Sequence, residues 1–89
     1  MAESEDTLME FPCEFSVKAM GLATPGFDAL IFGIVSRHAP NLSEGAVTTR
    51  SSKGGKYLSV SVTFEATGKP QLDAIYQALT DHDQVLMSL

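Results

Sequence analysis

The 89-residue chain has little cysteine, no tryptophan and few basic side chains. Its one cysteine, Cys13, excludes a disulfide within the chain, and such sparing use of cysteine predicts a reducing, cytoplasmic location. Six Lys and Arg residues against eleven Asp and Glu residues give a net charge of -5. Nucleic acids and anionic membranes are bound through clusters of positive charge, so this balance disfavours both as partners.

Long hydrophobic runs are also missing. The longest, residues 29–35, is interrupted by Gly33 and is far shorter than the roughly 20 residues that cross a bilayer. The acidic N-terminus lacks the basic-then-apolar order of a secretory signal. We therefore expect a disordered acidic leader over residues 1–8 and a single domain over residues 9–89.

The clearest pattern in the chain is a strict alternation of apolar and polar residues over residues 57–66. One side of this segment carries Leu58, Val60, Val62, Phe64 and Ala66, and the other carries Tyr57, Ser59, Ser61, Thr63 and Glu65. A period of two places successive side chains on opposite faces of a strand. A strand with one polar face is typical of an antiparallel sheet that is covered on one side only.

A helix is predicted between the first two strands, with an apolar stripe over residues 27–38. We expect the Thr24 hydroxyl to cap its first turn and Pro25 to occupy its first position. Arg37 and His38 are expected in its last turn, where positive charge suits the helix dipole.

The remaining elements complete a recognisable order. A first strand is predicted over residues 13–20, ending at Gly21, and a second strand over residues 46–51 is followed by a hairpin turn. Residues 67–70 open a second helix, and Val85, Met87 and Leu89 mark a last strand. The order βαββαβ predicts an α+β, ferredoxin-like fold. Its four-stranded antiparallel sheet has both helices on one face and the first and third strands in the centre.

The uncovered face of this sheet is where we expect a partner. It carries Ser16, Lys18, Ser59, Ser61 and Thr63. RNA-binding domains with this strand order stack bases on exposed aromatic side chains, whereas here only Tyr57 lies at the rim of the face. RNA recognition is therefore not expected.

Four segments of the chain together resemble the YbeD-like family of small bacterial proteins of unknown function. They are LMEFPCEFSVKAMG, RHAP, RSSKGGKYLSVSVTFEAT and LDAIYQALTDHDQVLMSL. The resemblance implies a fold similar to the ACT regulatory domains of amino-acid biosynthetic enzymes, and with it a role in allosteric regulation. Genes of the family often lie near genes for lipoate-attachment enzymes. This implies a connection to that pathway and says nothing about mechanism.

The basic turn between the second and third strands is the main candidate site. It comprises Arg50, Ser51, Ser52, Lys53, Gly54, Gly55 and Lys56. Glycines permit positive φ, so consecutive amides beside lysines can form a nest for an anion or a phosphate. Consecutive glycines are equally what a tight hairpin turn requires, so a purely structural role stays open. Arg37 and His38 are a second candidate for ligand or partner binding, with an ordinary helix end as the alternative.

No catalytic or metal site is predicted. Cys13 is expected to be a core thiol inside the first strand, and one cysteine with two dispersed histidines is not a zinc pattern. The sequence thus favours a cofactor-free, non-enzymatic regulatory or adaptor domain that binds a small molecule or a partner protein. We expect a homodimer, formed through the short second strand or across the polar face. The alternative is an enzyme or enzyme subunit that acts on a phosphorylated or acylated metabolite, including a lipoate-related one, through the basic turn.

Overall fold

A computed structural model describes residues 10–40, 42 and 44–89, and it has the predicted ferredoxin-like order. The elements are β1 (Cys13–Leu22), α2 (Phe27–Ser36), a short 3-10 helix η1 (Glu44–Ala46), β2 (Val47–Ser51), β3 (Tyr57–Ala66), α3 (Lys69–Thr80) and β4 (Met87–Ser88). The predicted leader, residues 1–8, lies outside the described residues.

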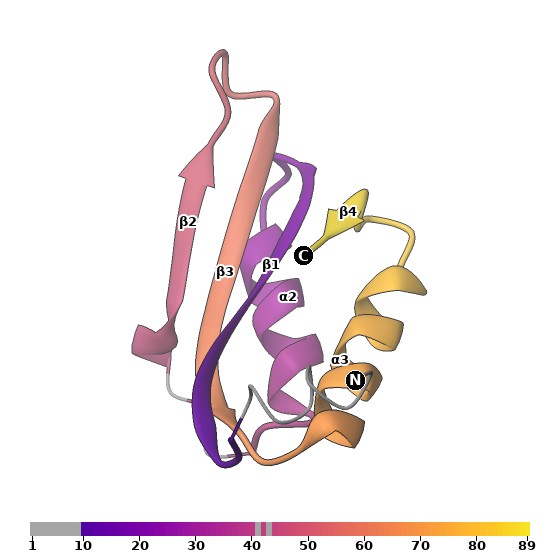
Figure 1. The fold of residues 1–89 in the computed structure, drawn as a ribbon. Helices are drawn as coiled ribbons and strands as arrows, with labels where there is room; N and C mark the ends of the chain where they lie inside the picture. The colour runs from indigo at the N-terminus through magenta and orange to yellow at the C-terminus, as the bar shows by residue number, and fades with distance from the viewer. Residues whose placement is uncertain (1–9, 41, 43) are drawn as a thin grey trace, which may run out of the picture.

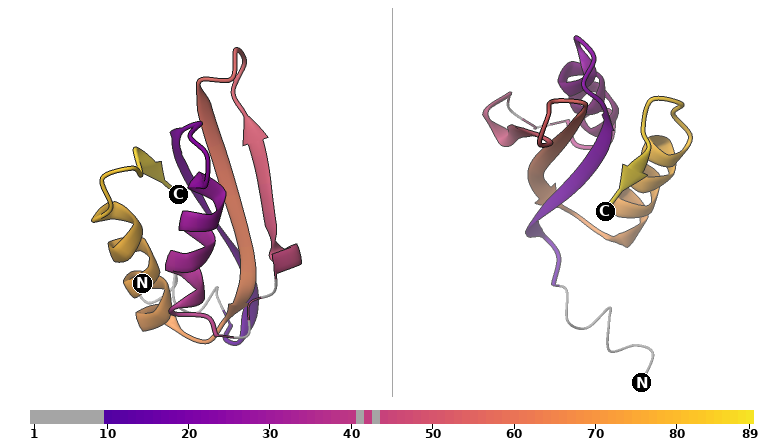
Figure 2. Two further views of the ribbon diagram at one scale, coloured as in Figure 1. Left: turned by 180° about the vertical axis from the view of Figure 1, so that it is seen from behind. Right: turned by 90° about the horizontal axis from the view of Figure 1, so that it is seen from above.

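One four-stranded sheet, in the order β2-β3-β1-β4, forms one layer of the protein, and all its strand pairs are antiparallel. The long strands β1 and β3 lie in the centre, as predicted. Helices α2 and α3 both lie on the same face of the sheet, as the view from behind in Figure 2 shows. None of the described helices lies on the opposite face, and Figure 1 looks onto it. We call it the open face.

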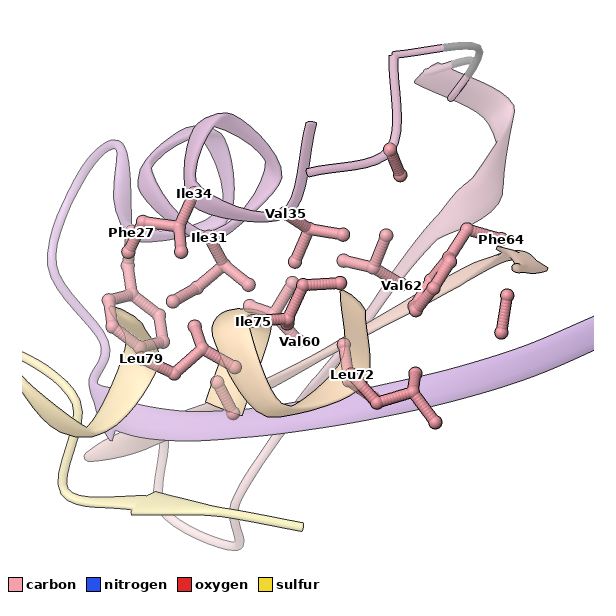
Figure 3. Close-up of a cluster of buried hydrophobic side chains, with 14 residues drawn as sticks. Phe27, Ile31, Ile34, Val35, Val60, Val62, Phe64, Leu72, Ile75 and Leu79 are labelled. Carbon is pink, nitrogen blue, oxygen red and sulfur yellow. The ribbon is translucent and has the colours of Figure 1, made fainter. Parts of the chain in front are cut away.

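The core lies between the sheet and the two helices (Figure 3). β1 pairs with β3 so that Val17 lies opposite Val62 and Ala19 lies opposite Val60, and all four side chains are fully buried. Helix α2 contributes Phe27, Ile31, Ile34 and Val35, and helix α3 contributes Leu72, Ile75 and Leu79. The apolar stripes predicted from helical and strand periodicity therefore face one another.

The prediction for the ends of α2 was wrong. The helix begins at Phe27 after Gly26, whose φ of 84° only glycine adopts readily, and no side chain among the described residues caps its first turn. Thr24 contributes its carbonyl instead, which accepts a hydrogen bond from the Phe27 N–H at 3.2 Å. The helix ends at Ser36, so Arg37 and His38 follow its last turn instead of lying in it.

The other boundaries differ less from the prediction. β1 continues past Gly21 to Leu22, and β4 covers only Met87 and Ser88. Helix α3 has a proline in its first turn, as predicted. Cys13, expected in the core, is half-buried at its edge, because it stands at the start of β1. Within the described residues, no helix is long and apolar enough to cross a membrane.

Candidate functional site

The two groups of candidate residues lie at opposite ends of the sheet (Figure 1). The hairpin joins β2 to β3 where β1 ends, and the Ala23 N–H donates to the Lys56 carbonyl at 2.9 Å. Helix α2 then runs back along the sheet and brings His38 to the other end. A ten-residue strand spans about 30 Å, so the two groups do not form one site.

The turn between β2 and β3 is fixed by its own hydrogen bonds. The Ser52 N–H donates to the Tyr57 carbonyl at 2.9 Å, and the Tyr57 N–H donates to the Ser52 Oγ at 2.9 Å. The Gly55 N–H donates to the Ser52 carbonyl at 2.8 Å. Gly54 and Gly55 have φ values of 91° and 76°, a conformation that strains residues with a Cβ. Ser52 and the two glycines therefore hold a defined turn.

The cationic side chains of this turn are exposed to solvent. Arg50, Lys53 and Lys56 are all exposed, and among the described residues none of them pairs with a carboxylate. The Lys56 Nζ lies 5.5 Å above the ring of Tyr57. We call residues 50–56 the basic hairpin, and Figure 1 shows its tip standing clear of the other elements. Because the Gly55 amide is already bonded within the turn, the lysines are better placed than a nest of amides to bind an anion.

Charged residues on the open face are separated by sign along the strands. In the strand register, Arg50 lies opposite Ser59 and Lys18 lies opposite Ser61, nearer the basic hairpin. At the far end, Glu14 lies directly opposite Glu65.

Hydroxyl groups fill the zone between these charged ends. The Ser16 Oγ and the Thr63 Oγ1 are 2.7 Å apart and share a hydrogen bond. The open face therefore has a basic end, a hydroxyl-rich middle and an acidic end.

His38 lines a hollow of about 420 Å³ at the acidic end. The hollow is bounded by His38, Ala39, Pro40, Leu42, Ala46, Thr63, Phe64, Glu65, Thr67 and Gln71. β2 pairs with β3 only as far as Val62, and the hollow lies beside the following part of β3, with which no strand of the described residues pairs on that side. Arg37 does not line it.

Gln71 supports the rim of this hollow, and sequence reasoning missed it. Its Nε2 donates to the His38 carbonyl at 2.6 Å, and its Oε1 accepts from the Thr67 N–H at 2.8 Å. The signal was present, because Gln71 stands three residues after Gly68, the N-cap of α3, and a glutamine at this position reaches back toward the start of a helix in a capping box. Here it accepts from Thr67, one residue before the N-cap. The hydrogen bond from Gln71 to the His38 carbonyl joins residues 33 apart in sequence, so no local pattern predicts it.

The other candidates for chemistry are dispersed. In the described part of the chain, no three His, Cys, Asp or Glu side chains lie close enough to hold a metal ion. His82 accepts a hydrogen bond at its Nδ1 from the Gln84 N–H at 3.2 Å, and so shapes the turn after α3. Burial raises the pKa of the Tyr76 hydroxyl above its ordinary value of 10.0, but this residue packs against the core.

Comparison with known proteins identifies relatives over almost the whole chain. The model of a family described as "Protein of unknown function (DUF493)" matches residues 6–89. The UPF0250 protein NE1487 of Nitrosomonas europaea is 43% identical over 86 residues, which cover 97% of this chain and 99% of the relative. A UPF0250 protein of Chromobacterium violaceum is 43% identical over 89 residues, the full length of both chains.

A solved structure supports the fold. The solution structure of protein HP0495 from H. pylori superposes with a TM-score of 0.68, over 91% of this chain and 85% of that one. The two chains are 17% identical, so this likeness concerns the fold alone.

Proposed function

The chain belongs to the DUF493 family of proteins of unknown function, and from its geometry we propose that it acts by binding, as a non-enzymatic adaptor whose basic hairpin docks on an acidic surface of a partner protein. The observation that carries this proposal is the position of three exposed cations, Arg50, Lys53 and Lys56, on a defined turn that stands clear of the fold. The rest of the chain is acidic, so this turn is a localised positive zone on a protein of net charge -5.

The physical chemistry of the hairpin suits docking. Charged side chains on an exposed surface steer a partner of opposite sign and fix its orientation. The glycines carry no side chain, and nothing lies within 4 Å of where a Cβ of Gly54 or Gly55 would be, so a partner can approach the backbone closely. The hydrogen bonds of Ser52 pre-organise the turn, which lowers the entropy that binding must overcome.

Catalysis at the hairpin is the alternative, and the composition of the turn argues against it. Residues 50–57 comprise Arg, Ser, Lys, Gly and Tyr, with no histidine, cysteine or carboxylate. A lysine can act as the base for a serine, but among the described hydrogen bonds no lysine of the hairpin contacts Ser51 or Ser52, and the Ser52 Oγ accepts from the Tyr57 N–H. The hairpin supplies charge and shape, which are what recognition needs.

A small-molecule effector is a second candidate, and the hollow beside His38 favours it. Its volume of about 420 Å³ is within the range of ligand pockets, and it combines an apolar wall with polar groups on its rim. A thermal-shift screen against amino acids, nucleotides and acyl donors tests this candidate, because a ligand that binds the folded state raises Tm by mass action. Turnover of any such compound by the purified protein would contradict the non-enzymatic proposal.

Capture of the partner tests the adaptor proposal itself. We would use three tagged baits in a lysate of the source bacterium: the wild-type chain, K53S/K56S and K69S. Lys69 is a matched control because it is an exposed lysine on α3, in the described part of the chain, and pairs only with Asp73 there, at 3.7 Å. A partner retained by the wild type and by K69S but lost with K53S/K56S would support the proposal. Equal retention by all three baits would exclude the hairpin as the docking element.

A further inference from the structure

The apolar side chains that the fold leaves exposed are gathered at one edge of the sheet. In the described part of the chain, four large hydrophobic residues are substantially exposed: Leu22, Leu86, Met87 and Leu89, at 48%, 59%, 52% and 64%. All four lie on or beside β4 and the end of β1 that is next to it. A soluble domain seldom leaves its exposed hydrophobic groups together unless something covers them.

The register places most of this patch on the open face. Met20 lies opposite Met87, and Lys18 exchanges two backbone hydrogen bonds with Leu89, at 3.1 and 2.8 Å. Leu22 is two residues beyond Met20 and therefore points to the same side. The apolar patch and the charge zones are consequently parts of one surface.

We propose that a second copy of this chain covers the open face, with the two sheets stacked and their strands antiparallel about a two-fold axis that lies in the interface and runs across the strands. Such an axis reverses the order of residues along each strand and leaves the order of the strands unchanged. The basic end of one copy then faces the acidic end of the other, and β4 faces β4. A two-fold axis that runs along the strands is the other possibility in this plane. It would place Glu14 and Glu65 of one copy over the same two carboxylates of the other copy.

The open face matches itself under this rotation at β4 and along β3. With the axis midway between the row of Lys18 and Ser61 and the row of Met20 and Ser59, Met87 of one copy faces Leu89 of the other. The hydroxyl groups of β3 then face one another, because Ser59 lies over Ser61 and Tyr57 lies over Thr63. Stacked sheets are about 10 Å apart, which leaves room for these side chains to meet.

The charged ends complete the match. The pair Glu14 and Glu65 comes over the level of Gly55 of the other copy, which lies between Lys53 and Lys56 in the turn. Like charges directly opposite on neighbouring strands destabilise a sheet, and within the described residues no cation is paired with either carboxylate. The second copy would supply that cation. An acidic partner protein would compete for the same lysines, so self-association and the proposed adaptor function would oppose each other.

Sedimentation equilibrium on the full-length protein, from micromolar to millimolar concentration, tests this inference. We expect the mass to rise with concentration from 9.5 kDa toward twice that value, and to do so less at high salt. M87S/L89S should remain monomeric over this range while keeping the circular dichroism spectrum of the wild type. T48S is the control, because Thr48 lies on the open face but away from the apolar patch. This variant should dimerise as the wild type does. A wild-type mass that stays at 9.5 kDa throughout would overturn the proposal.

A charge exchange tests the arrangement of the two copies. E14K/E65K should weaken the dimer at least tenfold, and K53E/K56E should weaken it similarly, because each brings like charges together. The chain that carries all four substitutions should recover most of the wild-type affinity. If the fourfold variant stays monomeric while wild type dimerises, the antiparallel stacking is wrong.

These outcomes are separable from failure of the adaptor function. M87S/L89S leaves the basic hairpin intact, so partner capture should persist or increase in this variant even when the dimer is lost.

Discussion

The ring of Phe27 lies directly against Gly21, so that a Cβ added to this glycine would stand 2.7 Å from two carbons of the ring. The same Cβ would also meet the carbonyl oxygen of Gln84. Gly21 is buried where β1 passes beneath the start of α2 and beside the segment that leads to β4. The absence of a side chain at this position lets three parts of the chain approach one another.

Replacement of Gly21 by alanine should therefore destabilise the fold. We expect a loss of about 1–3 kcal/mol in the free energy of unfolding, the usual cost of overpacking. Gly33→Ala is the matched control, because nothing lies within 4 Å of an added Cβ in the middle of α2, and it should be neutral or stabilising by up to about 1 kcal/mol. Urea denaturation measures both. Equal stabilities of the two variants would show that Phe27 yields to the added methyl group.

The basic hairpin should separate folding from binding. K53S/K56S should change the free energy of unfolding by less than about 0.5 kcal/mol, since exposed turn charges contribute little to stability. Gly54→Val and Gly55→Val should each cost about 1–3 kcal/mol, because valine must adopt the positive φ of these positions. Thermal unfolding distinguishes the two classes. A K53S/K56S variant as unstable as the glycine variants would mean that the lysines hold the turn.

Gln71 should stabilise the end of the fold that holds His38. Its loss in Gln71→Ala removes a donor to the His38 carbonyl and an acceptor for the Thr67 N–H, at about 1 kcal/mol for each hydrogen bond. Gln77→Ala on the same helix is the control, because Gln77 bonds only to the exposed Asp81 in the described structure, and it should cost under about 0.5 kcal/mol. The two variants are compared by denaturant titration. If Gln71→Ala lowers the free energy of unfolding less than Gln77→Ala does, the two hydrogen bonds of Gln71 do not stabilise this end of the fold.

Tyr76 should make the stability of the protein fall at alkaline pH. Burial raises the pKa of its hydroxyl in the folded state above the ordinary value of 10.0, because the charged form is poorly solvated there. The neutral form therefore favours folding. This contribution is fully present below pH 10 and is lost as the pH rises through the folded-state pKa, because the unfolded chain ionises first. The free energy of unfolding of the wild type and of Y76F is measured by denaturation across pH 8 to 11. Its fall with rising pH should be smaller in Y76F. Parallel curves would exclude Tyr76 as its source.

Much of the fold followed from the sequence, because periodicity reports directly which side chains face the core. The alternation over β3 predicted a one-sided sheet, and the stripe from Phe27 to Val35 predicted the face that α2 buries. The start of α2 was not predicted, since Gly26 in a left-handed conformation replaced the expected cap at Thr24.

The candidate site was less predictable, because its features depend on register and on contacts between distant segments. Glu14 lies opposite Glu65 because of the register between β1 and β3, and no local sequence pattern predicts that register. The exposure of Met87 follows from the pairing of β4 at the edge of the sheet. The basic hairpin was predicted as a turn because Gly54 and Gly55 signal it locally, and both glycines have the positive φ that the sequence permits.

The most direct test of the central claim is the affinity of the captured partner for the wild-type chain and for K53S/K56S, measured by titration calorimetry at low and at physiological salt. If the protein acts through its basic hairpin, the double variant should bind at least tenfold more weakly, and its remaining affinity should change less with salt than that of the wild type. Equal affinities and equal salt dependence of the two proteins would contradict the claim and leave the hairpin as a structural turn.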